Sequence, residues 1–105
     1  MGDRKKWRSV AALVQELLQK FAEGTTDPNL FTPETRAVFF PGMAKETGEF
    51  LKSLGALGLV ELVERKEEDG NRVYRYRLTF KETILFFTIR LTREDKIAGI
   101  RLLLE

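Results

Sequence analysis

The chain has 105 residues with 18 basic and 16 acidic side chains, a formal net charge of +2, and it contains neither cysteine nor histidine. This length accommodates one domain with one hydrophobic core, which we expect to span residues 1–105. Without cysteine there is no thiolate nucleophile or zinc–thiolate site, and without histidine there is no base for a serine triad. The nearly balanced charge makes nucleic acid and anionic membranes poor default partners.

No apolar run approaches the roughly 20 residues of a membrane-spanning helix. The amino terminus also lacks the apolar centre of a signal peptide. The sequence as written therefore predicts a soluble, cytoplasmic protein. Four basic residues around Trp7 are too few to define a phosphate or lipid site, and we interpret them as the solvated start of a helix.

Three helices are predicted in the first half of the chain. Apolar residues at helical spacing indicate the first helix over Ser9 to Glu23. Thr32-Pro33-Glu34 favours a second, short helix, because threonine caps a helix and proline is tolerated in its first turn. Pro41-Gly42 separates it from a third helix that ends at Gly55. One side of the third helix is predicted to carry Met43, Thr47, Phe50, Leu51 and Leu54.

After Gly58 the hydrophobic period changes to two, which indicates strands near residues 59–66, 72–80, 83–91 and 97–104. Asp69-Gly70 is a two-residue hairpin signal, because both residue types tolerate positive φ. A three-residue loop there would turn the opposite side of the first strand to the core, and the sequence leaves both open. The other two turns are predicted at residues 81–82 and 93–96.

Loops of two and four residues at those turns bring the last three strands into consistent registers. They set Tyr76 opposite Phe87 and Leu91 opposite Ala98. A slip of one residue would bury Arg75, at a cost of several kcal/mol. The resulting apolar face carries Tyr74, Tyr76, Leu78, Phe80, Leu85, Phe87, Ile89, Leu91, Ala98, Ile100, Leu102 and Leu104. We therefore expect an α+β fold with helices packed on one face of a curved, four-stranded antiparallel sheet.

The opposite face of the predicted sheet is mixed. It aligns Arg75, Thr88 and Arg101 in one row, which could be an anion site, a dimer interface or an exposed surface paired with glutamates. We favour an interface, because monomers rarely expose an apolar strip such as Ile84, Phe86, Ile97 and Leu103. The predicted interface residues are Arg75, Arg77, Ile84, Phe86, Arg101 and Leu103.

Several strings of the sequence resemble a cystatin-like, nuclear-transport-factor-two-like domain of the kind appended to bacterial serine hydrolases of the β-lactamase superfamily. They are Phe31-Thr32-Pro33-Glu34, residues 50–55, Val63-Glu64-Arg65, residues 69–77 and Lys96-Ile97-Ala98-Gly99. The resemblance implies a long helix across a curved sheet, a conical cavity between them and dimerisation through the outer sheet face. Relatives are often secreted or periplasmic. The chain departs from the pattern because it lacks a hydrolase domain and has Glu94-Asp95 at a turn where glycine is usual, as an excised or redesigned domain would.

The leading hypothesis is a non-catalytic module that binds a small hydrophobic ligand in an apolar cavity and forms a homodimer. No catalytic residue, cofactor or metal ligand is assigned. Adjacent residues such as Glu67 and Glu68 point to opposite strand faces and lack a calcium-loop pattern. The predicted cavity residues are Val14, Leu17, Leu18, Phe21, Tyr74, Tyr76, Phe87, Ile89, Ile100 and Leu102.

Two other functions are compatible with the sequence. An enzyme could use one pocket carboxylate as general base and a tyrosine as hydrogen-bond donor. The carboxylate would come from the helices or loops, and the candidates are Asp27, Glu34, Glu46 and Glu49. Alternatively, the domain could be an accessory of a serine hydrolase, as the resemblance implies.

Overall fold

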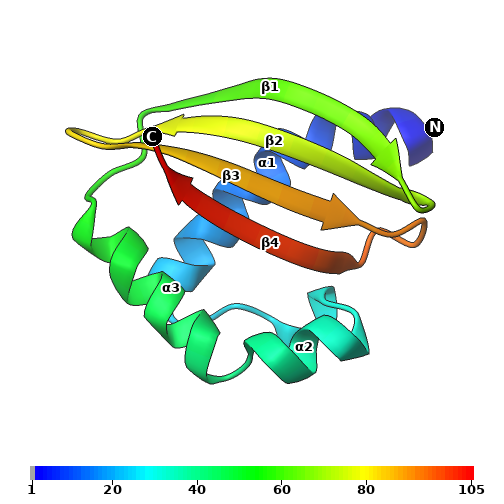
Figure 1. Cartoon of the computed structure of the whole chain (residues 1–105), viewed down its shortest axis with the longest axis horizontal. Coiled ribbons are helices and arrows are strands. Elements are labelled where there is room, and N and C mark those ends of the chain that lie inside the picture. Colours follow the sequence, from blue (N-terminus) through cyan, green and yellow to red (C-terminus); the bar gives the residue numbers. More distant parts are fainter. Residues whose placement is uncertain (1) are drawn as a thin grey trace.

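The computed structural model describes the backbone of residues 2–105 and the side chains of residues 10–105, so the basic cluster around Trp7 lies outside the described side chains. Helices occupy the first half of the chain and strands the second, as predicted (Figure 1). The elements are α1 (Gly2–Glu23), a 3-10 turn (Pro28–Leu30), α2 (Pro33–Phe39), α3 (Gly42–Ser53), β1 (Leu59–Glu68), β2 (Asn71–Thr79), β3 (Ile84–Leu91) and β4 (Ile97–Leu104).

The helix boundaries follow the local chemistry of the sequence. Gly24 ends α1 with a φ of 76°, a left-handed conformation that favours glycine. Thr32 caps α2, because its side-chain oxygen accepts a hydrogen bond from the amide of Thr35 at 3.2 Å. The predicted break at Pro41-Gly42 is confirmed, since α3 begins at Gly42.

The four strands form one antiparallel sheet in the order β1-β2-β3-β4. Asp69 and Gly70 have φ values of 54° and 82°, so the first hairpin has a two-residue turn with Glu68 opposite Asn71. This two-residue turn decides which side of β1 faces the core, a choice that the sequence left open. A bulge between Leu62 and Glu64 then shifts the pairing near the middle of the strand.

The predicted registers of β2, β3 and β4 are confirmed, with one correction. Tyr76 lies opposite Phe87, but Leu91 lies opposite Ile97 instead of Ala98. A bulge at the start of β4 adds one residue and turns Ile97 from the mixed face into the core, where only 1% of it is exposed. Ile97 therefore does not belong to the apolar strip of the outer face.

The prediction for α3 was only partly right. Its buried side carries Ala44, Gly48 and Leu51, which face α1, whereas Met43 is 50% and Phe50 37% exposed. The apolar pattern of α3 therefore spans two adjacent sides of the helix, of which only one is buried.

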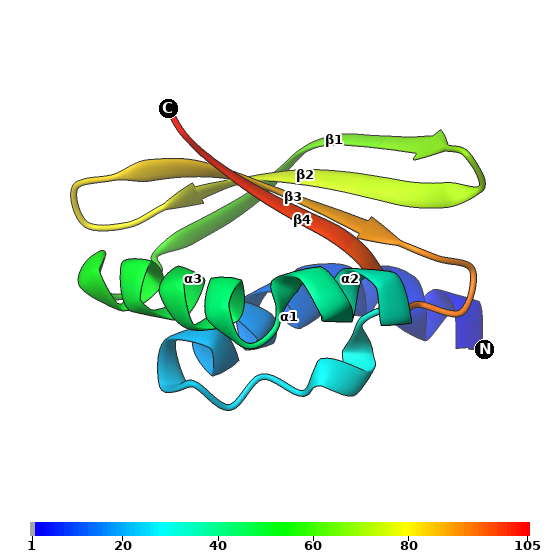
Figure 2. The same cartoon turned by 60° about the horizontal axis from the view of Figure 1, so that its bottom comes forward.

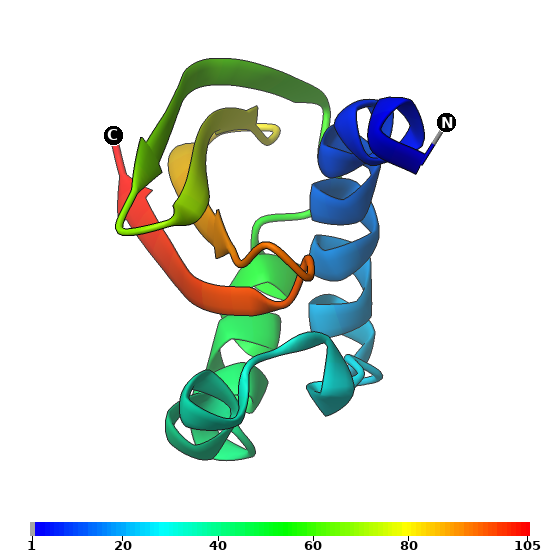
Figure 3. The ribbon, with the colours of Figure 1, turned by 90° about the vertical axis from the view of Figure 1, so that its right-hand side faces the viewer.

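All three helices lie on the same side of the sheet, and the core fills the space between the layers (Figure 2). The sheet is strongly twisted. The β1–β2 turn and the carboxyl end of β4, at opposite corners of the sheet, both bend away from the helices (Figures 2 and 3). In the part of the chain that the structure describes, no helix or strand packs on the other face of the sheet, the outer face.

Candidate functional site: the outer face of the sheet

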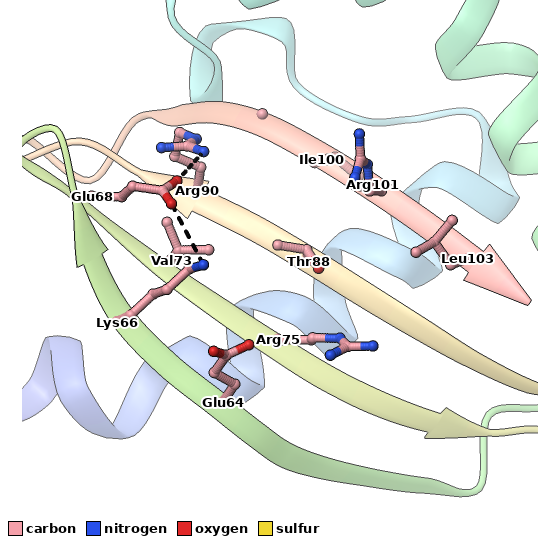
Figure 4. A pocket seen from close by; sticks show the side chains of 11 residues that line it. Glu64, Lys66, Glu68, Val73, Arg75, Thr88, Arg90, Ile100, Arg101 and Leu103 are labelled. Carbon is pink, nitrogen blue, oxygen red and sulfur yellow. Dashed lines mark hydrogen bonds and ion pairs between the residues drawn. The ribbon is translucent and has the colours of Figure 1, made fainter. Parts of the chain in front are cut away.

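The outer face contains a hollow of about 440 Å³ that crosses all four strands (Figure 4). Its lining has four basic and two acidic side chains, so its formal charge is 4 − 2 = +2. The lining residues are Glu64, Lys66, Glu68, Val73, Arg75, Thr88, Arg90, Gly99, Ile100, Arg101 and Leu103.

One row of side chains crosses this hollow from edge to edge. Glu64 on β1 is paired with Arg75 on β2, Arg75 with Thr88 on β3, and Thr88 with Arg101 on β4. The sequence predicted the last three members. It missed Glu64, because the side of β1 that faces outward depends on the length of the Asp69-Gly70 turn.

An ion-pair cluster covers one end of the hollow. The Glu68 carboxylate accepts a hydrogen bond from Arg90 Nη2 at 2.8 Å and lies 3.5 Å from Lys66 Nζ (Figure 4). The hydrogen bond from Arg90, followed by the charge of Lys66, lowers the pKa of Glu68. Val73 is cross-strand paired with both Lys66 and Arg90 and is only 6% exposed, although it lies on the open face.

At the other end of the outer face, basic side chains contact carboxylates or rings. Arg77 Nη1 lies 3.2 Å from Glu61 Oε1, and Arg77 Nε lies 3.5 Å from Glu105 Oε1. The Arg75 guanidinium lies over the ring of Phe86, 4.5 Å from its centroid. Both arginines therefore have partners within the same chain.

Within the described side chains, Glu64 and Arg101 form no ion pair, although each lies in the central row of the hollow. Glu64 lies on one edge strand and Arg101 on the other, so they are too far across the sheet to meet within one chain. The row therefore ends in an unpaired anion at one edge and an unpaired cation at the opposite edge.

All six predicted interface residues belong to this face by register. Leu103 is 49% exposed, while Ile84 and Phe86 are half-buried. The sequence analysis missed Lys66 and Glu68, whose side of β1 is set by the two-residue turn, and Val73, whose side of β2 follows from its alternation with Arg75.

The ten predicted cavity residues lie in one core cluster. Eight are buried, and Ile100 and Leu102 are partly buried against them. Each described hollow of the molecule is lined by only one of the ten, as Phe21 lines the hollow between α1 and α3. These side chains therefore contribute mainly to packing in the structure described.

Both tyrosines of the apolar face are almost fully buried, with Tyr74 1% and Tyr76 4% exposed. Burial, with a smaller contribution from Tyr74, raises the pKa of Tyr76 to about 12. The four candidate carboxylates are all exposed on the helices and loops, and Asp27 accepts a hydrogen bond from the amide of Asn29 at 2.9 Å. The structure does not bring them together with the tyrosines.

In the part of the chain that the structure describes, no cluster of three or more acidic side chains is arranged to hold a metal ion. No described helix combines the length and hydrophobicity needed to cross a membrane. Comparison of the chain with protein-family models, curated proteins and solved structures finds no match.

Proposed function

We propose that this chain is a non-catalytic interaction module that forms a homodimer through the outer face of its sheet. The proposal is supported mainly by the row formed by Glu64, Arg75, Thr88 and Arg101, which has opposite unpaired charges at its two ends. A surface that pairs with itself around a two-fold axis needs this kind of complementarity.

The geometry follows from how twisted sheets stack. Two sheets with the same twist pack face to face with their strands nearly aligned. A two-fold axis parallel to the strands and between β2 and β3 sets β1 of one copy over β4 of the second. The row then faces itself, with Glu64 opposite Arg101 of the second copy and Arg75 opposite Thr88 of the second copy.

Apolar groups on the same face supply the hydrophobic part of the contact. Ile84, Phe86 and Leu103 would be removed from water, and such burial is the main favourable term in association. Arg77 would lie over Phe86 of the second copy, where guanidinium–ring contact is favourable. The apolar residues lie toward one end of β3 and β4, beside the charged row, so the contact would combine hydrophobic burial with ion pairs.

Charge reversal combined with sedimentation velocity tests the dimer. We expect the wild-type chain to sediment as a dimer at micromolar concentration, and Glu64→Arg or Arg101→Glu to dissociate it, because each places like charges opposite one another. The double variant Glu64→Arg/Arg101→Glu restores the pairs with their signs exchanged and should be dimeric again. Glu67→Arg is the matched control, since Glu67 is exposed on the opposite side of β1.

A wild-type chain that stays monomeric at these concentrations contradicts the proposal. So does a dimer that survives both single reversals, because it would use another surface. That the module serves beside a serine hydrolase stays a prediction, which copurification with such a partner would test.

A further inference from the structure

A second exposed surface of the molecule lies at the edge of the sheet formed by β4. Strand β4 is an edge of the sheet, and helix α3 lies beyond that edge (Figures 1 and 3). The α1–α2 connection covers only the start of β4, where Phe31 forms a bridge with Ile97 and the amide of Thr32 donates to the Ile97 carbonyl at 2.9 Å. Among the described residues, no further strand or backbone hydrogen bond covers the rest of β4 on this side.

The backbone of β4 offers hydrogen-bonding groups at this edge. The amide of Glu105 donates to the carbonyl of Ile84 at 3.1 Å. Glu105 and every second residue before it in β4 therefore hydrogen-bond to β3. Because these positions alternate in an antiparallel pair, the N–H and C=O groups of Ile100, Leu102 and Leu104 point away from β3. No other described backbone group bonds to these three residues.

Most edge strands are protected against further pairing, and β1 shows the usual means. It carries six charged residues between Glu61 and Glu68 and a bulge near its middle. Beyond its bulged start, β4 is almost entirely apolar, with Arg101 as its single charge and no proline. Strand β4 therefore lacks the protection against further strand pairing that β1 has.

Helix α3 and its C-cap Leu54 carry a stripe of half-buried or exposed side chains, three of them apolar, namely Met43, Thr47, Phe50 and Leu54. These residues lie about a quarter turn from the side that packs on α1. The opposite side of α3, which includes Lys45 and Lys52, borders a hollow that no sheet residue lines. The stripe therefore lies on the side of α3 that faces the sheet, next to β4. No described strand covers it there.

We propose that the open edge of β4 and the apolar stripe of α3 form a docking site for one extended polypeptide segment of a partner, bound as a fifth strand beside β4. Only an extended backbone matches the row of outward amides and carbonyls. Alternate side chains of that strand would lie over Met43 and Phe50, so they should be apolar. On the other face they lie beside Arg101, so a carboxylate there is complementary in charge.

A second copy of this chain fits this edge less well. Helices α2 and α3 project past β4, so an edge-to-edge approach would bring the same helices of both copies into one space (Figures 1 and 3). A slender segment avoids that overlap. The inference does not rest on the proposed dimer, because the backbone edge of β4 and the side of α3 lie outside the outer face, and Arg101 is the one residue that both proposals use.

Fluorescence anisotropy with a labelled seven-residue peptide, valine alternating with glutamate, tests the site on the full chain. N-methylation of the peptide amides that face β4 should weaken binding at least tenfold, while methylation of the alternate amides leaves it within twofold. Amides of Ile100, Leu102 and Leu104 should exchange more slowly with solvent in the complex. Phe50→Glu should weaken binding at least tenfold, and Val38→Glu, at a 73% exposed position on α2, should not.

Absence of binding up to millimolar peptide overturns the proposal. Equal effects of the two methylation patterns also overturn it, because they would show that no directional strand pairing occurs. The methylation result needs no protein variant, so it decides the question even if Phe50→Glu fails to fold. Unchanged exchange at the three edge amides in a complex that does form would place the peptide elsewhere and equally contradict the inference.

Discussion

Gly48 on α3 lies directly against the backbone carbonyl of Phe21 on α1, so closely that a methyl group at this position would overlap with the carbonyl oxygen. The two helices are therefore as close as a residue without a side chain allows. We predict that Gly48→Ala destabilises the fold by roughly 2–4 kcal/mol, because the clash is with backbone that cannot move aside. Chemical denaturation measures the change.

Gly42→Ala is the matched control for this substitution. It lies on the same helix, but an added methyl group would meet nothing within 4 Å. Since alanine is the better helix former, Gly42→Ala should leave stability unchanged or raise it by up to about 1 kcal/mol. Equal effects of the two substitutions would show that the α1–α3 contact is looser than described.

Arg72 on β2 forms an ion pair with Asp95 in the β3–β4 turn, and Arg72 Nη2 also donates to the Thr92 carbonyl at 3.2 Å. Asp95 has a φ of 66°, which aspartate tolerates better than most residues. We predict that Asp95→Ala costs about 1–3 kcal/mol through the lost charge-assisted hydrogen bond and the strained φ. Asp95→Asn keeps the turn preference, so thermal denaturation should show a smaller loss for it. Equal losses would mean that the ion pair alone accounts for the effect.

Most of the fold was predictable because side-chain alternation leaves few choices. A slip of β2 against β3 would bury Arg75, and the observed register avoids this. The error within the sheet comes from a single inserted residue, since the bulge at the start of β4 turned Ile97 into the core. The row of the candidate site was predicted except for Glu64, whose placement depends on the length of one turn. Periodicity cannot detect a bulge or choose a turn length.

Ile97 tests that bulge directly. Because 1% of it is exposed, Ile97→Ala should leave a cavity and cost about 2–4 kcal/mol. Leu62→Ala, at a 50% exposed position on β1, should cost less than about 1 kcal/mol. Urea denaturation of both variants compares them. A small cost at Ile97 would return that residue to the outer face and restore the regular register.

Glu68 should make stability depend on acid pH. Its pKa is lowered in the folded state by the hydrogen bond from Arg90 and the charge of Lys66, so its ionised form favours folding. This contribution is complete above the ordinary value of 4.5 and is lost as pH falls through the lowered pKa. The difference in unfolding free energy between wild type and Glu68→Gln should therefore shrink as pH falls below 4.5. A constant difference between wild type and Glu68→Gln across this pH range would contradict the ion-pair cluster.

Tyr76 should limit stability at alkaline pH. Burial raises its pKa to about 12 in the folded state, compared with 10.0 when exposed. A raised folded pKa means that the neutral phenol favours folding, so this contribution is complete below pH 10 and is lost as pH rises toward 12. In a Tyr74→Phe variant Tyr76 is the only tyrosine and keeps the larger contribution from burial, so ultraviolet absorption should show it titrating clearly above 10 and returning to about 10 in urea. Titration near 10 in the folded variant would mean that the phenol reaches water and that the layer between helices and sheet is open.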